Sequence, residues 1–302
     1  MFVIRALFLC VILTSCQRVA AQYEDNNYDF PRTEGEIKYV VAITSRAGVC
    51  TGTIINQNWI LTAAHCFFFK GKIIGEKDAK ILAGIINYDV PRSTTKQETM
   101  SSKIVVNPHF WLNRVGKFDV ALVRLRDPLD FNEFAGSIPI AADGWPQSEN
   151  KTEDCMSVGF GGYRSAAPPT KDLKVWNVTA EHGDSACPCA RRFQNKRLVC
   201  VKELLYPQVC KGDDGGPLVC GSVVRAISHM VWNTLACEDP TYPLEKCVGG
   251  PVKGLSTYTF LCPLNSWMHE HVDDIPVTPE SCAADHLWTN RLLVYSLLLL
   301  LY

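Results

Sequence analysis

Short hydrophobic runs separated by turn-forming residues dominate the chain from Lys38 to Trp267. Runs rich in β-branched and aromatic residues, such as YVVAI, TIINQNWIL, AKILAGII, DVALVRL and GSVVRAI, alternate with clusters of Gly, Pro, Asn and Asp. This pattern is typical of the strands of an all-β sandwich or barrel. The polar stretch DGWPQSENKTED at 143–154 is the most linker-like internal segment, and it divides the β region into two nearly equal halves.

The N-terminal pattern is that of a secretory signal peptide. Arg5 precedes an apolar run over 6–13, and the small residues Val19-Ala20-Ala21 suit cleavage before Gln22. The run is too short to span a bilayer, and a buried first helix is the alternative. We predict a signal peptide at 1–21 and export of the chain, followed by a polar, unpacked leader at 22–36.

Composition and cysteine usage suit an extracellular protein. Loss of Cys10 and Cys16 with the signal leaves 12 of the 14 cysteines, an even number that we expect to form disulfides. The close pair Cys187-Pro188-Cys189 lacks the spacing of a zinc site, so no metal or cofactor is expected. Sequons at Asn150 and Asn177 predict N-glycosylation. With 30 basic and 31 acidic residues spread along the chain, nothing favours a nucleic-acid partner.

The chain changes character after Trp267. A polar stretch leads to the C-terminal LLVYSLLLLLY, about eleven apolar residues, whereas a transmembrane helix needs roughly 20. Small residues at 281–284, the spacer DHLWTNR and this apolar end resemble a glycolipid attachment signal, with Ala283 as the expected site. We therefore read 271–302 as a polar stalk and a tail that would tether the protein to the outer cell surface. A buried terminal helix or simple secretion is the alternative.

Three segments carry residues of a catalytic type in a fixed order. His65 lies in Thr62-Ala63-Ala64-His65-Cys66, and Asp119 opens DVALVRL about fifty residues later. The third segment is the glycine-rich loop CKGDDGGPLVC at 210–220. A histidine, an aspartate and such a loop, in this order, are the chain order of the chymotrypsin-type triad. Packing or capping would explain each segment alone, but not the ordered set.

On these segments the chain from about 38 to 268 resembles the trypsin- and chymotrypsin-like serine proteases. The resemblance implies two six-stranded antiparallel β-barrels, at about 37–142 and 155–262, in a domain at 37–270 that ends in a short C-terminal helix. Gly159-Phe160-Gly161 resembles the Gly-Trp-Gly with which the second barrel of the family opens.

The resemblance also implies site roles and disulfides. His65 matches the general base, Asp119 the residue that orients it, Gly212 the oxyanion-binding glycine, Asp213 the buried aspartate and Asp214 the nucleophilic serine. The implied bridges are Cys50 with Cys66, Cys155 with Cys220, Cys210 with Cys237, and Cys200 with Cys187 or Cys189. Four cysteines then remain, namely the unused one of Cys187 and Cys189 together with Cys247, Cys262 and Cys282. They could form two further bridges, whose connectivity the sequence leaves open.

Four departures from the family pattern bear on activity. Asp214 replaces the serine, and a carboxylate has no hydroxyl proton for the histidine to remove. A cut after Arg32 would create the polar start Thr-Glu-Gly, which is ill suited to burial. Gln208, six positions before Asp214, matches the residue at the base of the family's primary specificity pocket, which is acidic in trypsins and a small serine in chymotrypsins. At the substrate-pairing edge, Ser228-His229-Met230 replaces Ser-Trp-Gly, so methionine would crowd the groove.

Together these departures predict a catalytically inactive homologue that works by binding. Relatives of this kind resemble adaptors or regulators of extracellular proteases, in defence cascades or reproductive fluid, with proteases or their substrates as partners. A hydrolase that uses Asp214 with His65, or a decoy for protease inhibitors, is the alternative. We expect the imidazole of His65 to be held between Asp119 and Asp214 as a doubly hydrogen-bonded cation.

Overall fold

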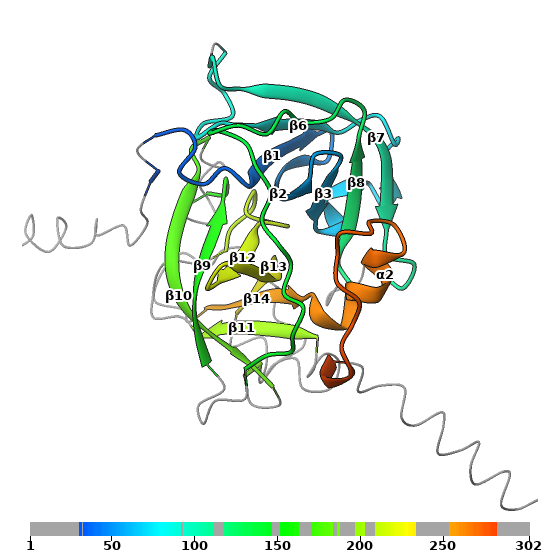
Figure 1. Cartoon of the computed structure of the whole chain (residues 1–302), viewed down its shortest axis with the longest axis vertical. Helices are drawn as coiled ribbons and strands as arrows, with labels where there is room; N and C mark the ends of the chain where they lie inside the picture. Colours follow the sequence, from blue (N-terminus) through cyan, green and yellow to red (C-terminus); the bar gives the residue numbers. More distant parts are fainter. Residues whose placement is uncertain are drawn as a thin grey trace, which may run out of the picture.

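The fold consists of two closed barrels of six antiparallel strands each, followed by a short helix. The computed structural model describes residues 30–31, 33–91, 93–111, 118–146, 152–162, 171–183, 186–187, 197–202, 209–233 and 254–282. In Figure 1 the first barrel occupies the upper half in blue to cyan, and the second lies below in green to orange. The prediction of an all-β protein with two six-stranded barrels and a short C-terminal helix is confirmed.

The first barrel has the strand order β1-β2-β3-β8-β7-β6. Its strands form because β-branched residues fit a pleated, buried surface, and Val41, Ile43 and Ile54 are at most 2% exposed. The helical turn η1 and the small hairpin of β4 and β5 lie between β3 and β6. The bounds are β1 (Val40–Ser45), β2 (Gly48–Asn56), β3 (Trp59–Thr62), η1 (Ala64–Phe67), β4 (Phe68–Phe69), β5 (Lys72–Ile73), β6 (Lys80–Ala83), β7 (Gln97–Val106) and β8 (Ala121–Leu125).

The second barrel has the order β10-β11-β14-β13-β12-β9. Alternation along β10 places Lys174, Trp176 and Ala180 on the buried face, at 0%, 2% and 0% exposure. A lysine therefore points into this barrel beside a tryptophan. The bounds are β9 (Thr152–Gly159), β10 (Lys174–His182), β11 (Leu198–Lys202), β12 (Pro217–Cys220), β13 (Val223–Asn233) and β14 (Gly254–Phe260).

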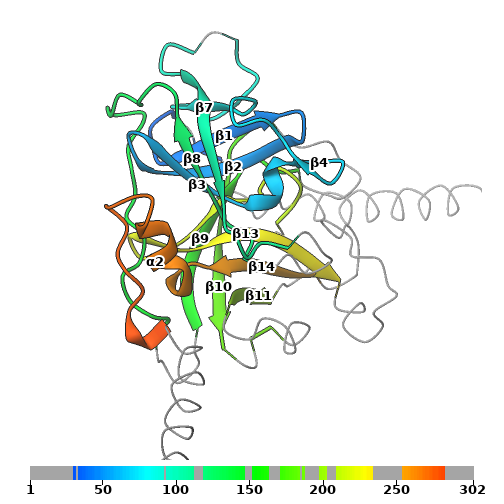
Figure 2. The same ribbon diagram turned by 90° about the vertical axis from the view of Figure 1, so that its right-hand side faces the viewer.

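The segment after β14 packs where the two barrels meet. It contains η4 (Cys262–Leu264), α2 (Asn265–His269) and η5 (Glu280–Cys282). Met268 is fully buried, in one cluster with Leu122 of the first barrel and Val224 of the second. Figure 2 shows α2 beside the strands β13 and β14 that cross below the first barrel. The buried apolar side chains of this segment thus hold the two barrels together. The candidate site lies at the interface between these barrels.

The linker-like stretch at 143–154 lies between the two barrels, and its described start at 143–146 docks against the second one. Trp145 is 5% exposed and packs against Phe260. Asp143 pairs with Arg225 of β13, with 3.1 Å between Oδ1 and Nη1. One tryptophan and one ion pair thus dock the described start of a segment whose composition is otherwise polar.

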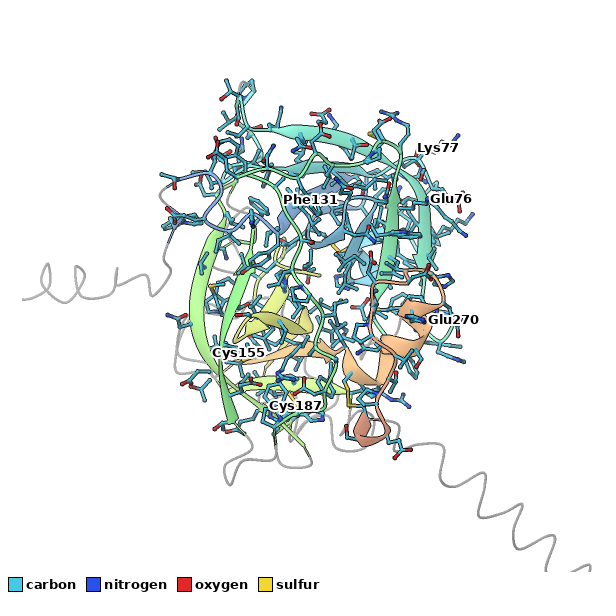
Figure 3. The ribbon with its side chains drawn as sticks, in the orientation of Figure 1. Glu76, Lys77, Phe131, Cys155, Cys187 and Glu270 are labelled. Carbon is cyan, nitrogen blue, oxygen red and sulfur yellow. A yellow bond between two sulfur atoms is a disulfide. The ribbon has the colours of Figure 1, made fainter. Side chains whose placement is uncertain are left out.

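Four disulfides lie within the described residues: Cys50–Cys66, Cys155–Cys220, Cys187–Cys200 and Cys262–Cys282. The first two confirm pairs that the resemblance implied, and the third selects Cys187 over Cys189; Figure 3 labels Cys155 and Cys187. The fourth is a pairing that the sequence left open. Cys210 is disulfide-bonded as well, whereas Cys189, Cys237 and Cys247 lie outside the described residues.

The proposed signal peptide, most of the leader and the apolar tail also lie outside the described residues. Among the helices of the described part, none has the length and apolar character needed to cross a membrane.

Candidate active site

His65 and Asp119 come together because β3 and β8 are neighbours in the first barrel. His65 lies in η1, directly after β3, and Asp119 lies just before β8, where Thr62 pairs with Ala121. The His65 amide donates to Asp119 Oδ1 at 2.8 Å, and His65 Nδ1 lies 2.6 Å from Asp119 Oδ2. Two contacts from one residue fix both the backbone and the ring of the histidine relative to the carboxylate.

A second imidazole shares the same carboxylate. His229 sits at a bulge in β13, where the pairing with β14 shifts between Ser228 and Met230. Its Nδ1 lies 2.7 Å from Asp119 Oδ2, and the residue is 1% exposed. The sequence placed His229 only at a pocket edge. Strand alternation could not predict this contact because the bulge changes which way the side chain points.

The loop that carries Asp213 and Asp214 is shaped by glycines. Gly212 and Gly215 have φ values of +106° and +81°, which residues with a Cβ rarely adopt. A Cβ on Gly215 would also lie 2.1 Å from Thr62 Oγ1. Thr51 of β2 completes the attachment, since its hydroxyl donates to the Gly212 carbonyl at 2.7 Å. The loop is thereby pressed against the first barrel and brings Asp214 to His65.

Asp214 reaches in two directions with one carboxylate. Its Oδ1 lies 3.4 Å from His65 Nε2, and its Oδ2 accepts the Gly212 amide at 3.4 Å. The expected double hydrogen bond on the histidine is therefore only half present: Nε2 makes an ion-pair contact without hydrogen-bond geometry. Asp214 thus contacts both the general-base position and the amide that the resemblance assigns to the oxyanion.

The electrostatics of this cluster favour a charged imidazole. Burial works to lower the pKa of His65, but the charges of Asp119 and Asp214 outweigh it and raise the pKa to about 10. Burial works to raise the pKa of Asp119, but the charge of His65 and hydrogen bonds from both imidazoles hold it well below its usual range. At neutral pH His65 carries its proton already and cannot accept another.

Asp213 is fully buried and has a cation of its own. Its Oδ1 accepts the Gly161 amide at 2.6 Å, its Oδ2 accepts the Cys210 amide at 2.9 Å, and Lys174 Nζ lies 3.2 Å from Oδ2. Lys174 also donates to the Gly162 carbonyl at 3.0 Å. This pair was not predicted from the sequence. Its signal was a lysine two residues before Trp176 in a strand pattern, on the face expected to be apolar.

The remaining predicted pocket residues are only partly described. Ser228 is 1% exposed, its carbonyl accepts the Gly215 amide at 2.8 Å, and its hydroxyl has no hydrogen-bond partner among the described residues. Gln208 and Asn150 lie outside the described residues, as does the side chain of Met230. The crowding of the groove by methionine stays a prediction.

The three groups His65, Asp119 and His229 offer ligand atoms within 4.8 Å of one another. Two ligands of a tetrahedral zinc ion at 2.0–2.1 Å lie about 3.3 Å apart, whereas Asp119 Oδ2 lies 2.6 Å and 2.7 Å from the two imidazole nitrogens. These contacts have the length of charge-assisted hydrogen bonds. The cluster is therefore arranged to hold protons rather than a metal ion.

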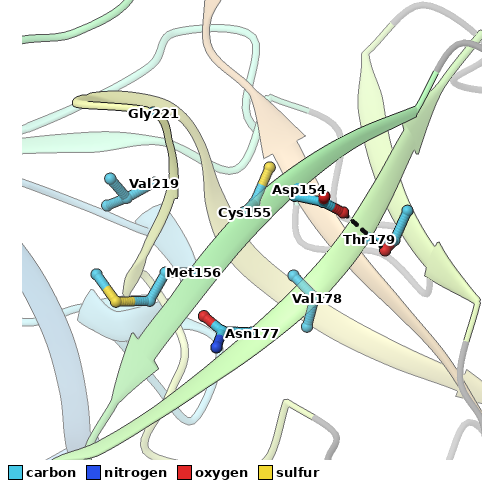
Figure 4. Close-up of a pocket in the computed structure, with 8 residues that line it drawn as sticks. All are labelled: Asp154, Cys155, Met156, Asn177, Val178, Thr179, Val219 and Gly221. Atoms are coloured by element: carbon cyan, nitrogen blue, oxygen red, sulfur yellow. Dashed lines mark hydrogen bonds between the residues drawn. The ribbon is translucent and has the colours of Figure 1, made fainter.

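A cavity of about 540 Å³ lies elsewhere, between β9, β10 and β12 of the second barrel (Figure 4). Asn177 and Thr179, the first and third residues of a sequon, line it, and Thr179 Oγ1 donates to Asp154 Oδ1 at 3.0 Å. None of the residues of the candidate active site lines this cavity. The exposed position of Asn177 on β10 suits the predicted glycosylation, which remains untested.

The family model described as Trypsin matches residues 29–244. The chain belongs to the trypsin family. Pig (Sus scrofa) trypsin is 24% identical over 243 residues, which cover 78% of this chain and 90% of that protein. Scolexin B of Heliothis virescens is 31% identical over 206 residues, with coverage of 63% and 68%.

The solved structures give the same fold for this trypsin-family chain. A mouse protein described as neuropsin, a serine protease, superposes with a TM-score of 0.62 at 20% identity, over 80% of this chain and 97% of that one. At this identity the likeness establishes the double-barrel fold, and the chemistry has to be argued from the residues of this site.

Proposed function

We propose that this trypsin-family protein is non-catalytic and acts outside the cell by binding other proteins, as an adaptor or regulator of extracellular proteases. The observation that carries the proposal is the position of Asp214. Its carboxylate contacts His65 on one side and the Gly212 amide on the other. The two groups that would activate a nucleophile and stabilise an oxyanion are both engaged by an anion of the chain itself.

Three physical arguments support the loss of catalysis. A carboxylate at neutral pH has no proton for a general base to remove. Its attack on a peptide would give a tetrahedral adduct that expels the carboxylate again more readily than the amine, so the acyl-enzyme anhydride would hardly form. Its negative charge lies next to the place where an oxyanion would form, and so opposes the transition state. His65 is moreover protonated, with a pKa raised to about 10. In another protease, removal of the nucleophile costs on the order of 10⁶ in turnover.

The setting we propose is extracellular. Four disulfides among the described residues suit an oxidising compartment, and the signal-like N-terminus and the apolar tail favour secretion or a lipid tether at the outer cell surface. A phosphatidylinositol-specific phospholipase applied to expressing cells tests the tether. Release of the protein supports it, whereas soluble protein that retains Tyr302 by mass spectrometry contradicts it.

Catalysis is tested by incubating the purified protein with a fluorophosphonate probe and with a broad peptide library, beside pig trypsin. We expect no labelling and no cleavage at probe concentrations that label trypsin fully. Cleavage that disappears in His65→Ala would contradict the proposal and establish the hydrolase alternative.

The binding role is tested by cross-linking in the native fluid, followed by affinity purification and mass spectrometry. We expect proteases or their substrates among the cross-linked proteins. Exclusive recovery of protease inhibitors would overturn the adaptor role in favour of a decoy.

A further inference from the structure

We propose that Lys174 orders the 210–216 loop by pairing with the buried carboxylate of Asp213, and that the loop is equally ordered whether or not the chain is cut after Arg32. If the protein acts by binding as proposed above, the uncut chain is then the acting form. The inference concerns the order of the loop and does not depend on whether the site is catalytic.

The buried carboxylate of Asp213 is the point at which the loop is fastened. It holds the amides of Gly161 and Cys210 and follows Gly212 directly. A Cβ on Gly161 would lie 2.3 Å from the carboxylate of Asp213, so the backbone packs tightly around this carboxylate. An unpaired charge at 0% exposure would be strongly destabilising. A cation at Asp213 offsets this cost and allows the carboxylate to hold both amides in its charged form.

Lys174 is built to be that cation. It opens β10, where it pairs with Gly159 of β9, so its backbone belongs to the barrel wall. Its ammonium is fully buried, lies 5.2 Å from the ring centre of Trp176, and donates to the Gly162 carbonyl as well as to Asp213. A lysine held by strand pairing and by an aromatic ring loses little further entropy when it meets the carboxylate.

The residue that a cut after Arg32 would expose is engaged elsewhere. The Thr33 amide donates to Glu36 Oε1 at 3.0 Å in an exposed turn, and Glu34 accepts the Ser93 hydroxyl at 2.8 Å on the first barrel. The N-terminal segment therefore has partners of its own, while the cation site at Asp213 is occupied by Lys174.

The test compares amide hydrogen exchange at Gly161 and Cys210 in two secreted forms, the uncuttable variant Arg32→Gln and a chain that begins at Thr33. We expect their rates to agree within about twofold. In Lys174→Met these two amides should exchange about 100-fold faster or more, because a buried carboxylate is left unpaired. The amides of Val41 and Ile43 in β1 should keep their rates.

The matched control is Lys171→Met. Lys171 lies three residues before Lys174 in the chain, but it is exposed and pairs with Asp89. This variant should leave both loop amides unchanged. The proposal is wrong if the chain that begins at Thr33 exchanges tenfold more slowly than the uncut form, or if Lys174→Met has no effect on Gly161 and Cys210.

A second variant keeps the test decisive if Lys174→Met fails to fold. Lys174→Met combined with Asp213→Asn buries no uncompensated charge, so it should fold. An asparagine offers a single acceptor oxygen for the two amides, and at least one of them should exchange faster than in the wild type. Wild-type rates at both amides would show that the charge pair does not order the loop.

Discussion

Asp119 and Asp213 are two carboxylates at almost zero exposure, one on each side of the barrel interface, but they are held in different ways. Asp119 lies against two imidazoles at 2.6 Å and 2.7 Å. Asp213 lies against one ammonium at 3.2 Å and two backbone amides. The pKa of Asp119 is held well below its usual range, whereas burial raises the pKa of Asp213.

The difference shows that the partner, and not burial alone, decides how such a group responds to its surroundings. Imidazoles can give up a proton within a few pH units of neutrality, so the Asp119 cluster can lower its charge when conditions change. The ammonium of Lys174 is also fully buried, and burial lowers its pKa by more than the contact with Asp213 raises it. The partners of the Asp119 cluster therefore favour its charged forms, whereas burial opposes the charges of the Asp213 pair.

The largest expected effect is on the free energy of unfolding, when each of the two carboxylates is neutralised separately. Asp213→Asn leaves the Lys174 ammonium buried without its anion and should lower the free energy of unfolding by about 3–5 kcal/mol. Asp119→Asn should cost about 1–3 kcal/mol, because His65 can release its proton once this anion is gone. Urea unfolding at pH 7 measures both. Equal losses, or a larger loss for Asp119→Asn, would contradict the distinction.

The pH dependence of stability should come next in size. The pKa of His65 in the folded protein, about 10, lies above the ordinary value of 6.5 for a histidine. Its contribution is therefore complete below about pH 6.5 and is lost as the pH rises towards 10, by up to a few kcal/mol. The difference in urea midpoint between the wild type and His65→Gln, measured from pH 6 to 10, isolates the contribution of His65 to stability. A constant difference between the two proteins would show that His65 does not titrate in this way.

Removal of the charge of Asp214 should have a smaller effect. Asp214→Asn takes away one of the two anions that raise the pKa of His65, and we expect this pKa to fall by about one unit or more. Asp119 remains in contact, so the value should stay above 6.5. An NMR titration of the His65 ring measures it. No change in pKa would mean that the 3.4 Å contact with Asp214 carries little energy.

The smallest change is expected for activity. Asp214→Ser restores a hydroxyl, but His229 still shares Asp119, and the substrate-edge replacement Met230 and the pocket residue Gln208 are unaltered. We expect peptide turnover to stay on the order of 10³ or more below that of trypsin. Cleavage at ordinary protease rates would show that Asp214 alone prevents catalysis and that the other departures are harmless.

The sequence predicted the parts of this molecule that local patterns encode. The alternating runs predicted strands, and the ordered motifs predicted that His65, Asp119 and Asp214 meet, as they do. The role of Lys174 and the contact of His229 with Asp119 were missed for a physical reason. The position of Lys174 relative to Asp213 depends on how a strand packs against a distant loop, and that of His229 on a bulge. Neither follows from the spacing of residues along the chain.

The disulfide between Cys262 and Cys282 gives the C-terminal end of the described chain a mechanical role. Cys262 follows β14 closely, so a pulling force applied beyond Cys282 would pass through the bridge directly to the wall of a closed barrel. The span between the two cysteines, which are 20 positions apart in the sequence and enclose α2, would carry almost no load. A single protease cut within that span would likewise leave the two ends covalently joined. Anything attached after Cys282 would stay with the barrel until the bridge is reduced.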